Sequence, residues 1–191
     1  MKDYNILLVD DDISILKALK RVLHNEDHIR KLTVFTVTNA MEALDIMKNL
    51  TIHLVISDEG MPGMLGNKFL KLVKCKFPST MRVMLTGQAS LEVAIKAINE
   101  GEIYRFLTKP WDNIELLITV RQALNQYDLE AKNRYLLKKV NQHVVTLQHL
   151  EKQYPGITKV EIDHDGGILV PDLNEMSDED LDEIIAECED L

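Results

Sequence analysis

Short apolar runs alternate with helical patterns over residues 4–110 of the chain. Five of these runs are rich in aliphatic and β-branched residues, and they cover residues 4–9, 32–37, 53–57, 81–86 and 103–108. Their near-continuous apolarity is typical of strands that are covered on both faces, as in a parallel sheet. The stretches between the runs repeat apolar residues with a helical period. This alternation predicts an α/β fold with right-handed crossovers and a doubly wound, five-stranded parallel sheet.

A long helical pattern begins after Asp112, which is a favourable N-cap residue, and contains no proline or glycine before Pro155. At about 1.5 Å per residue, a helix over 113–153 would be roughly 60 Å long, which is more than a domain of this size can cover. Its second part carries a heptad stripe spaced 4-3-4-3-4, made up of Leu136, Val140, His143, Leu147, Leu150 and Tyr154. The stripe predicts a protruding helix that pairs with a second copy as a coiled coil. The alternative is a bent pair of shorter helices that folds back on its own domain.

Two further elements are predicted after the long helical pattern. Two alternating segments flank a turn sequence with two glycines, which predicts a small β-hairpin over 155–171. His164 and Asp165 stand in this turn and are interpreted as turn residues rather than as a metal-binding pair. A capping-box sequence at 177–180 then predicts a short acidic amphipathic helix.

The charge of the chain is concentrated at one end. The formal net charge is −9, and residues 171–191 carry ten acids with neither Lys nor Arg, which leaves a formal charge of +1 on residues 1–170. Such a tail is repelled by nucleic acid and suits a basic protein surface, either on a partner or on this chain. The predicted parts of the chain are a domain at 1–125, a helical extension at 126–154, the hairpin at 155–171 and the acidic tail with its helix at 172–191.

No apolar run approaches the roughly 20 residues that a helix needs to span a bilayer, and acids stand near the N-terminus where a signal peptide needs its apolar stretch. We therefore expect a soluble, cytoplasmic protein without a membrane partner. Cys75 and Cys188 show no metal-ligand spacing and are interpreted as free thiols in a reducing compartment.

The residues with candidate chemistry stand at the carboxyl ends of the predicted strands. Asp10 and Asp11 follow the first strand, Asp58 follows the third, Thr86 ends the fourth and Lys109 follows the fifth. In an open α/β sheet this edge is where ligands bind. Carboxylates brought together there repel one another unless a hard divalent cation such as Mg²⁺ neutralises them. A lysine and a hydroxyl at the same place suit a phosphoryl group, which an aspartate can accept as an acyl phosphate.

Four motifs of the chain resemble, in their order and spacing, the receiver domain of two-component response regulators. They are ILLVDD at 6–11, VISD at 55–58 followed by MPG at 61–63, MLTG at 84–87 and FLTKP at 106–110. The resemblance covers residues 1 to about 125 and implies the flavodoxin-like fold with strand order 2-1-3-4-5. It also implies that a histidine kinase or a phosphotransfer protein phosphorylates Asp58. The cofactor would be Mg²⁺ or Mn²⁺, and the resemblance implies as its ligands Asp10, Asp11, Asp58 and the backbone carbonyl of Gly60.

The same resemblance implies roles for three residues at the ends of the later strands. Thr86 would move toward the phosphoryl group, and Lys109 would pair with it. Phe106 matches the aromatic position whose rotamer responds to this shift. The alternative interpretation is that Phe106 is an ordinary core residue, since a buried aromatic side chain needs no further function. The Lys109–Pro110 bond matches a cis peptide bond in the family.

Two positions depart from the usual receiver pattern. Glu59 and Gly60 stand where many receivers carry bulkier or amide side chains. Gly60 leaves the metal-binding carbonyl available but removes any side chain that would orient or block an attacking water. Glu59 adds a negative charge beside the site unless it points away. Gln88, two residues after Thr86, is a candidate to position the water, so the lifetime of the aspartyl phosphate stays open in both directions.

Other polar residues receive structural interpretations. Asp12 is interpreted as a helix N-cap, since this position strongly favours aspartate. His24, His28 and His53 show no ligand spacing and are interpreted as structural.

We expect a signalling switch rather than a metabolic enzyme, with no chemistry beyond self-phosphorylation from small donors and self-dephosphorylation. Phosphorylation of Asp58 would alter pairing of the long helix in a homodimer, or exposure of the acidic tail to a downstream protein. About 65 residues follow the receiver-like part, and they contain neither a nucleotide-binding glycine loop nor a basic helix-turn-helix.

Three other classes remain as alternatives. The first is a receiver-bearing fragment of a longer regulator with transcriptional or cyclic-dinucleotide output. The second is an aspartate-nucleophile phosphohydrolase, although Glu59 and Gly60 stand where a second acid-base aspartate would be needed. The third is a scaffold that has lost phosphorylation. Direct nucleic-acid binding is not expected, because the basic residues Lys132, Arg134, Lys138 and Lys139 are typical of a solvated helix face.

Overall fold

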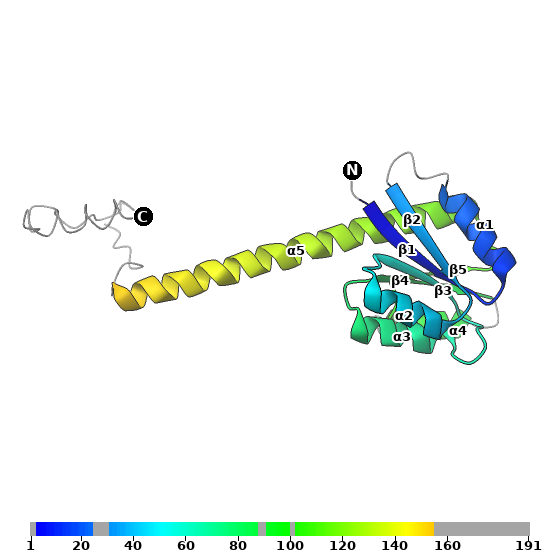
Figure 1. The fold of residues 1–191 in the computed structure, drawn as a ribbon, viewed down its shortest axis with the longest axis horizontal. Coiled ribbons are helices and arrows are strands. Elements are labelled where there is room, and N and C mark those ends of the chain that lie inside the picture. The colour runs from blue at the N-terminus through cyan, green and yellow to red at the C-terminus, as the bar shows by residue number, and fades with distance from the viewer. Residues whose placement is uncertain (1–2, 25–30, 88–90, 100–101, 155–191) are drawn as a thin grey trace, which may run out of the picture. The chain divides into compact units, whose positions relative to one another are not determined.

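The computed structural model describes residues 3–24, 31–87, 91–99 and 102–154. Its core is a five-stranded parallel sheet in the order β2-β1-β3-β4-β5, as the flavodoxin-like prediction required (Figure 1). The strands are β1 Asp3–Val9, β2 Lys31–Val37, β3 Leu54–Asp58, β4 Met81–Thr86 and β5 Arg105–Thr108. The helices are α1 Ile13–His24, α2 Ala40–Asn49, α3 Gly66–Lys76, α4 Leu91–Asn99 and α5 Asn113–Gln153. The predicted hairpin, the acidic helix, Gln88, His28 and Cys188 lie outside the described residues.

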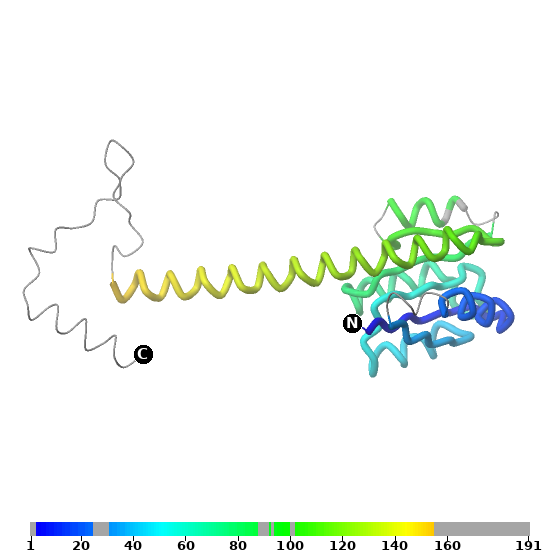
Figure 2. The backbone as a smooth tube through the Cα atoms, turned by 90° about the horizontal axis from the view of Figure 1, so that it is seen from above, coloured from blue at the N-terminus to red at the C-terminus, as the bar shows by residue number. Residues whose placement is uncertain are grey.

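Helices cover both faces of the sheet. The first turns of α5 and the apolar side of α1 pack on one face, and α2, α3 and α4 pack on the other (Figure 1). Consecutive residues of β1 therefore enter different cores: Ile6 and Leu8 face α1 and α5, whereas Leu7 and Val9 face the other three helices. Burying each such side chain stabilises the fold by about 1.5–3 kcal/mol, which explains why β1 is apolar without interruption from Ile6 to Val9. Both views show β1 beside β2 (Figure 2).

Strand ends differ from the predicted ones by one or two residues. Asp58 was expected just after the third strand, but it is the last residue of β3 and pairs in register with Leu85 of β4. His53, predicted in that strand, instead precedes it. There His53 lies edge-on to the rings of Tyr4 and Tyr127, and its Nδ1 accepts a hydrogen bond from the Asn5 N–H at 2.9 Å. Burial lowers the pKa of His53, so the structure supports the structural interpretation of this histidine.

The long helix is continuous. Helix α5 has 41 residues, and the Oδ1 of Asp112 accepts hydrogen bonds from the N–H groups of Ile114 and Glu115 at 2.8 and 3.0 Å, as expected of an N-cap. The alternative of two shorter helices is therefore wrong. The buried residues of α5 end at Leu124. In this single chain most apolar residues of the heptad stripe are exposed, with Val140 at 56% and Leu147 at 51%, while Leu150 is half-buried.

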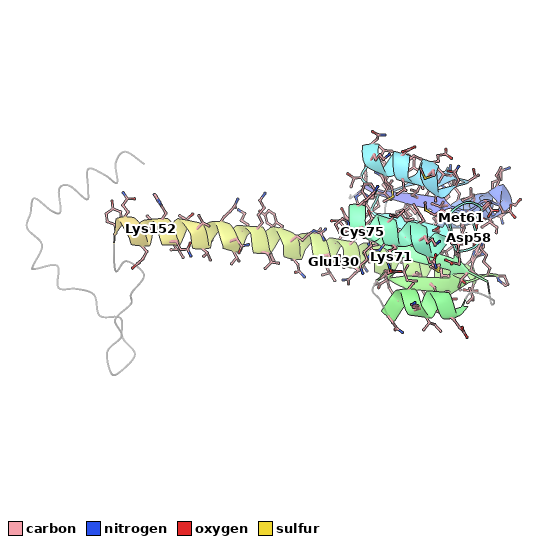
Figure 3. The ribbon with its side chains drawn as sticks, turned by 90° about the horizontal axis from the view of Figure 1, so that it is seen from below. Asp58, Met61, Lys71, Cys75, Glu130 and Lys152 are labelled. Atoms are coloured by element: carbon pink, nitrogen blue, oxygen red, sulfur yellow. The ribbon has the colours of Figure 1, made fainter. Side chains whose placement is uncertain are left out.

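The chain divides into two compact units, Met1–Leu136 and Leu137–Leu191. Among the described residues, no helix is both long and apolar enough to cross a membrane. Cys75 is a free, exposed thiol on α3 (Figure 3). The Lys109–Pro110 peptide bond is cis, as the family resemblance implied.

Candidate functional site

The carboxyl end of the sheet brings a lysine and two aspartates into direct contact. Asp10 follows β1, Asp58 ends β3 and Lys109 follows β5. The Nζ of Lys109 lies 2.7 Å from Oδ2 of Asp10 and 2.6 Å from Oδ1 of Asp58. Both aspartates are buried, and the Lys109 side chain is 22% exposed. Residues that are 99 positions apart in sequence thus form one site, because parallel strands end at the same edge of the sheet.

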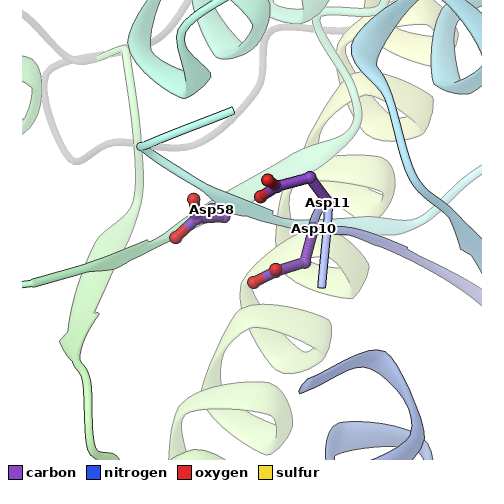
Figure 4. A group of neighbouring side chains, drawn as sticks. All are labelled: Asp10, Asp11 and Asp58. Atoms are coloured by element: carbon purple, nitrogen blue, oxygen red, sulfur yellow. The ribbon is translucent and has the colours of Figure 1, made fainter. Parts of the chain in front are cut away.

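A third carboxylate joins this site. Ligand oxygens of Asp10, Asp11 and Asp58 all lie within 4.8 Å of one another (Figure 4). Asp11 is exposed, so the cluster is open to water on one side. Mg²⁺ prefers carboxylate and carbonyl oxygens and retains several waters, and this donor set therefore fits it. The cluster could hold a divalent cation in the arrangement expected from the sequence.

Burial and hydrogen bonds shift the pKa values of the charged side chains at this site. Burial raises the pKa of Asp10, and the hydrogen bonds from Lys109 and from the Asp12 N–H offset part of this effect. Burial opposes the charge of Lys109, but its hydrogen bonds to Asp10 and Asp58 outweigh burial and raise the pKa of Lys109. Lys109 is therefore protonated at neutral pH, and it supplies the positive charge that the carboxylates need.

The backbone around Asp58 holds its second oxygen. The N–H of Gly60 donates a hydrogen bond to Oδ2 of Asp58 at 2.7 Å. A Cβ at position 60 would lie 3.3 Å from the same oxygen, so any side chain there would crowd the carboxylate. Gly60 therefore contacts the Asp58 carboxylate through its N–H, and the role of its carbonyl as a metal ligand stays a prediction.

Glu59 points away from the acid cluster. Its side chain is buried, and its Oε2 accepts a hydrogen bond from the N–H of Asn67 at the start of α3, at 2.8 Å. Burial raises the pKa of Glu59, the Asn67 N–H lowers it, and the charge of Asp58 raises it further. Of the two orientations left open by the sequence, the structure shows the one directed away from the acid cluster.

The predicted switch residues lie on β4 and β5. Thr86 is fully buried, and its hydroxyl donates a hydrogen bond to the carbonyl of Gly87 at 3.1 Å rather than to a group of the acid cluster. The carbonyl of Thr86 accepts the N–H of Lys109 at 2.8 Å, which places the lysine beside the carboxylates. Phe106 is half-buried against the core of α2, α3 and α4. This placement suits both the switching role and the core role, so the switch stays a prediction.

Asp12 takes the predicted structural role. Its Oδ1 accepts the N–H of Ser14 at 2.7 Å in the first turn of α1, and this hydrogen bond lowers the pKa of Asp12. Its own N–H donates to Oδ1 of Asp10 at 3.0 Å. Gly66 and Asn67, whose N–H groups contact Glu59, were not predicted to belong to the site, because no pattern in the sequence marks these contacts.

Replacing Lys109 with methionine should lower the stability of the metal-free protein and enlarge the stabilisation that Mg²⁺ supplies. Removing one partner of a buried ion pair leaves the other charges uncompensated, and we expect a loss of about 2–3 kcal/mol because Lys109 is partly exposed. Urea unfolding in EDTA and in Mg²⁺ measures both effects. Lys48→Met, at the exposed pair with Asp45, is the matched control. Equal Mg²⁺ stabilisation of wild type and Lys109→Met would contradict the expectation.

Comparison with known proteins agrees with this geometry. The sequence model of the response regulator receiver domain matches residues 6–121. The hydrogenase transcriptional regulatory protein HoxA of Bradyrhizobium diazoefficiens is 34% identical over 127 residues, covering 66% of this chain and 25% of HoxA. The DNA-binding transcriptional regulator NtrC of Escherichia coli is 32% identical over 129 residues, covering 68% of this chain and 26% of NtrC. The chain thus spans about a quarter of the length of these relatives.

Solved structures of similar proteins carry the same fold. The signal receiver domain of an HD domain-containing protein from Pseudomonas fluorescens is 39% identical with a TM-score of 0.63, and the match covers 69% of this chain and 94% of that one. A response regulator receiver domain protein from Clostridium thermocellum is 31% identical with a TM-score of 0.61, covering 66% and 98%. Because the family model matches residues 6–121, and the strand order, the acid cluster and the bridging lysine agree with it, the chain belongs to the response regulator receiver domain family.

Proposed function

We propose that this chain is a two-component response regulator in which Asp58 accepts a phosphoryl group from a histidine kinase or a phosphotransfer protein. The observation that carries the proposal is the position of the Lys109 ammonium group between Asp58 and Asp10, inside a cluster of carboxylates. Such a site suits a reaction in which an anionic group is transferred to a carboxylate. The proposed localisation is cytoplasmic.

The protein groups that the proposed transfer step uses already meet at the site, and a divalent cation would complete them. A carboxylate oxygen of Asp58 attacks the phosphorus of the donor, the bond from phosphorus to the donor nitrogen or oxygen breaks, and the donor leaves with that electron pair. Lys109 stabilises the negative charge on the transferred group, and the Gly60 N–H holds the other carboxylate oxygen. Asp10, Asp11, Asp58 and the Gly60 carbonyl would hold Mg²⁺ or Mn²⁺, which when bound neutralises charge on the phosphoryl oxygens.

The proposed output is a change in protein association. Contacts made only in the phosphorylated state, such as a hydrogen bond from the Thr86 hydroxyl, would bias the arrangement of β4, α4 and Phe106. The exposed heptad stripe of α5 is the proposed surface for homodimer pairing. Under this proposal the chain has no metabolic enzyme activity. Its only reactions are self-phosphorylation from small donors and self-dephosphorylation.

A second candidate is a receiver-bearing part of a longer transcriptional regulator. It is supported by the names of the relatives HoxA and NtrC, which are transcriptional regulatory proteins, and by the quarter of their length that this chain spans. In that case the same phosphorylation would act on an output domain outside this sequence.

Intact-mass analysis with acetyl phosphate tests the proposal. In Mg²⁺ the protein should gain one phosphoryl group that hydroxylamine removes, as expected of an acyl phosphate, and in EDTA it should gain none. Light scattering of both forms then measures whether phosphorylation changes the association of the chain. No mass gain in Mg²⁺ would contradict the acceptor role, and unchanged association at full phosphorylation would contradict the dimer as output.

A further inference from the structure

The first turn of α3 lacks a cap from its own N-cap residue. That residue is Leu65, which has no side-chain hydrogen bond to the helix and is 45% exposed. The first N–H groups of a helix have no partner within the helix and need an acceptor from elsewhere. In α2 the side chain of Asn39 accepts the N–H of Glu42, and in α5 Asp112 does the same for its helix. Helix α3 must therefore find its acceptor outside the usual position.

Glu59 supplies that acceptor from the end of β3. Its Oε2 accepts the N–H of Asn67 at 2.8 Å, and its backbone carbonyl accepts the N–H of Gly66 at 2.9 Å. Its own N–H donates to the carbonyl of Leu85 in β4 at 3.0 Å. The side chain is 5% exposed, so these hydrogen bonds form with little competition from water. Glu59 thus ties the ends of β3 and β4 to the start of α3.

These hydrogen bonds close the loop that carries Gly60. The loop of residues 60–65 leaves the sheet at Glu59 and returns to it at Gly66, so the Glu59 contacts form its base. Gly60 has no Cβ, and its backbone samples more conformations than that of any other residue unless the surroundings restrict it. In this structure its N–H lies 2.7 Å from Asp58 Oδ2, so the 59–60 peptide is directed at the Asp58 carboxylate. Closure at Glu59 provides that restriction.

We propose that Glu59 is a positioning residue for the divalent cation, because its closure of the loop at the start of α3 orients the backbone of Gly60 toward the acid cluster. This inference rests on the proposed function, in which the Gly60 carbonyl is a metal ligand. The helix N-terminus accommodates the charge of Glu59, which lies next to Asp58 in sequence, and keeps it out of the cation site. The arrangement joins the two residues in which this chain departs from the usual receiver pattern.

Calorimetric titration with Mg²⁺, in the absence of any phosphodonor, tests the role of Glu59. Substitutions of residues that orient metal ligands typically cost about 10–100-fold in affinity, and we expect a loss of about tenfold for Glu59→Ala. Glu59→Gln retains an oxygen that accepts the Asn67 N–H and should remain within about threefold of wild type. The Mg²⁺ concentration for half-maximal phosphorylation should rise in Glu59→Ala by the same factor as the dissociation constant.

A double variant separates positioning from helix stability. Leu65→Asp introduces a local N-cap acceptor for α3, which should raise the melting temperature of Glu59→Ala back toward that of wild type. It does not close the loop, so the double variant should recover thermal stability and still bind Mg²⁺ about tenfold more weakly than wild type.

Four results would overturn the inference, and the first three differ from a failure of the proposed function. If Glu59→Gln bound Mg²⁺ as weakly as Glu59→Ala, the negative charge of Glu59, and not its positioning of the loop, would determine the Mg²⁺ affinity. Full recovery of affinity in the double variant would reduce Glu59 to a helix cap. Normal affinity in Glu59→Ala, or no Mg²⁺ binding by wild type, would remove the role. If wild type binds Mg²⁺ and accepts no phosphoryl group, the proposed function fails and the positioning role of Glu59 stands.

Discussion

An Asp58→Asn variant is expected to accept no phosphoryl group from acetyl phosphate under conditions that modify the wild-type protein. The amide nitrogen and oxygen of asparagine are poor nucleophiles, so the acyl phosphate cannot form, while the side-chain volume is nearly unchanged. The loss should be complete within detection. Among the described residues, Asp10 is the only other carboxylate that pairs with Lys109, and it already accepts hydrogen bonds from Lys109 and from the Asp12 N–H. Intact mass and urea unfolding together measure the loss and the integrity of the fold.

Asp45→Asn is the matched control for this experiment. Asp45 lies on α2, where its exposed carboxylate pairs with Lys48 at 2.6 Å, and this substitution also removes one negative charge. It should be phosphorylated like wild type. If Asp58→Asn gained the same mass as Asp45→Asn, the acceptor would have to be another residue, and the assignment of Asp58 would be wrong.

A Gly66→Ala variant is expected to lose about 3 kcal/mol of stability and most of its capacity for phosphorylation. A Cβ at this position would lie 2.0 Å from the carbonyl oxygen of Asp58 and 2.8 Å from the Cα of Glu59. Both are backbone atoms, so the strain cannot be relieved by a side-chain rotation, and this places the cost at the upper end for an overpacked site. Either α3 or the end of β3 must move, and movement of β3 displaces the acceptor itself.

The control for steric strain is Gly87→Ala. Apart from its chain neighbours, no heavy atom of the described residues lies within 4 Å of the position that a Cβ at residue 87 would take, so we expect a change of less than about 1 kcal/mol. Thermal unfolding compares the two variants, and intact mass with acetyl phosphate compares their reactivity. A Gly66→Ala protein as stable as Gly87→Ala would show that α3 can shift on β3 at little cost.

The arrangement of the sheet could be predicted because burial leaves a local record in the sequence. A strand such as β1, whose residues alternate between two cores, has to be apolar where both of its faces are buried, as Ile6 to Val9 are, and the pattern therefore shows both the strand and its two-sided burial. The acid cluster could be predicted for a related reason. Once the strands are known to be parallel, the residues after β1, at the end of β3 and after β5 must share an edge.

The orientation of Glu59 was not predictable in the same way. Its acceptor role depends on the N–H of Asn67, eight residues later, and on the absence of a polar side chain at Leu65. The sequence shows which residues stand at positions 65 and 67. Only the packing of α3 on the end of β3 places the Asn67 N–H next to the Glu59 side chain. The need for glycine at position 66 has the same origin, since the clash arises with a backbone atom of Asp58.

By itself the sequence determined the kind of fold, the order of its elements, the long helix and the set of residues at the carboxyl edge of the sheet. These properties depend on side-chain polarity at regular spacing, which is a local quantity. Only the tertiary structure decided which carboxylates Lys109 contacts, that Glu59 serves α3 rather than the cation, and that Gly66 cannot bear a side chain. Each of these depends on distances between backbone segments, and such distances are set by how whole elements pack against one another.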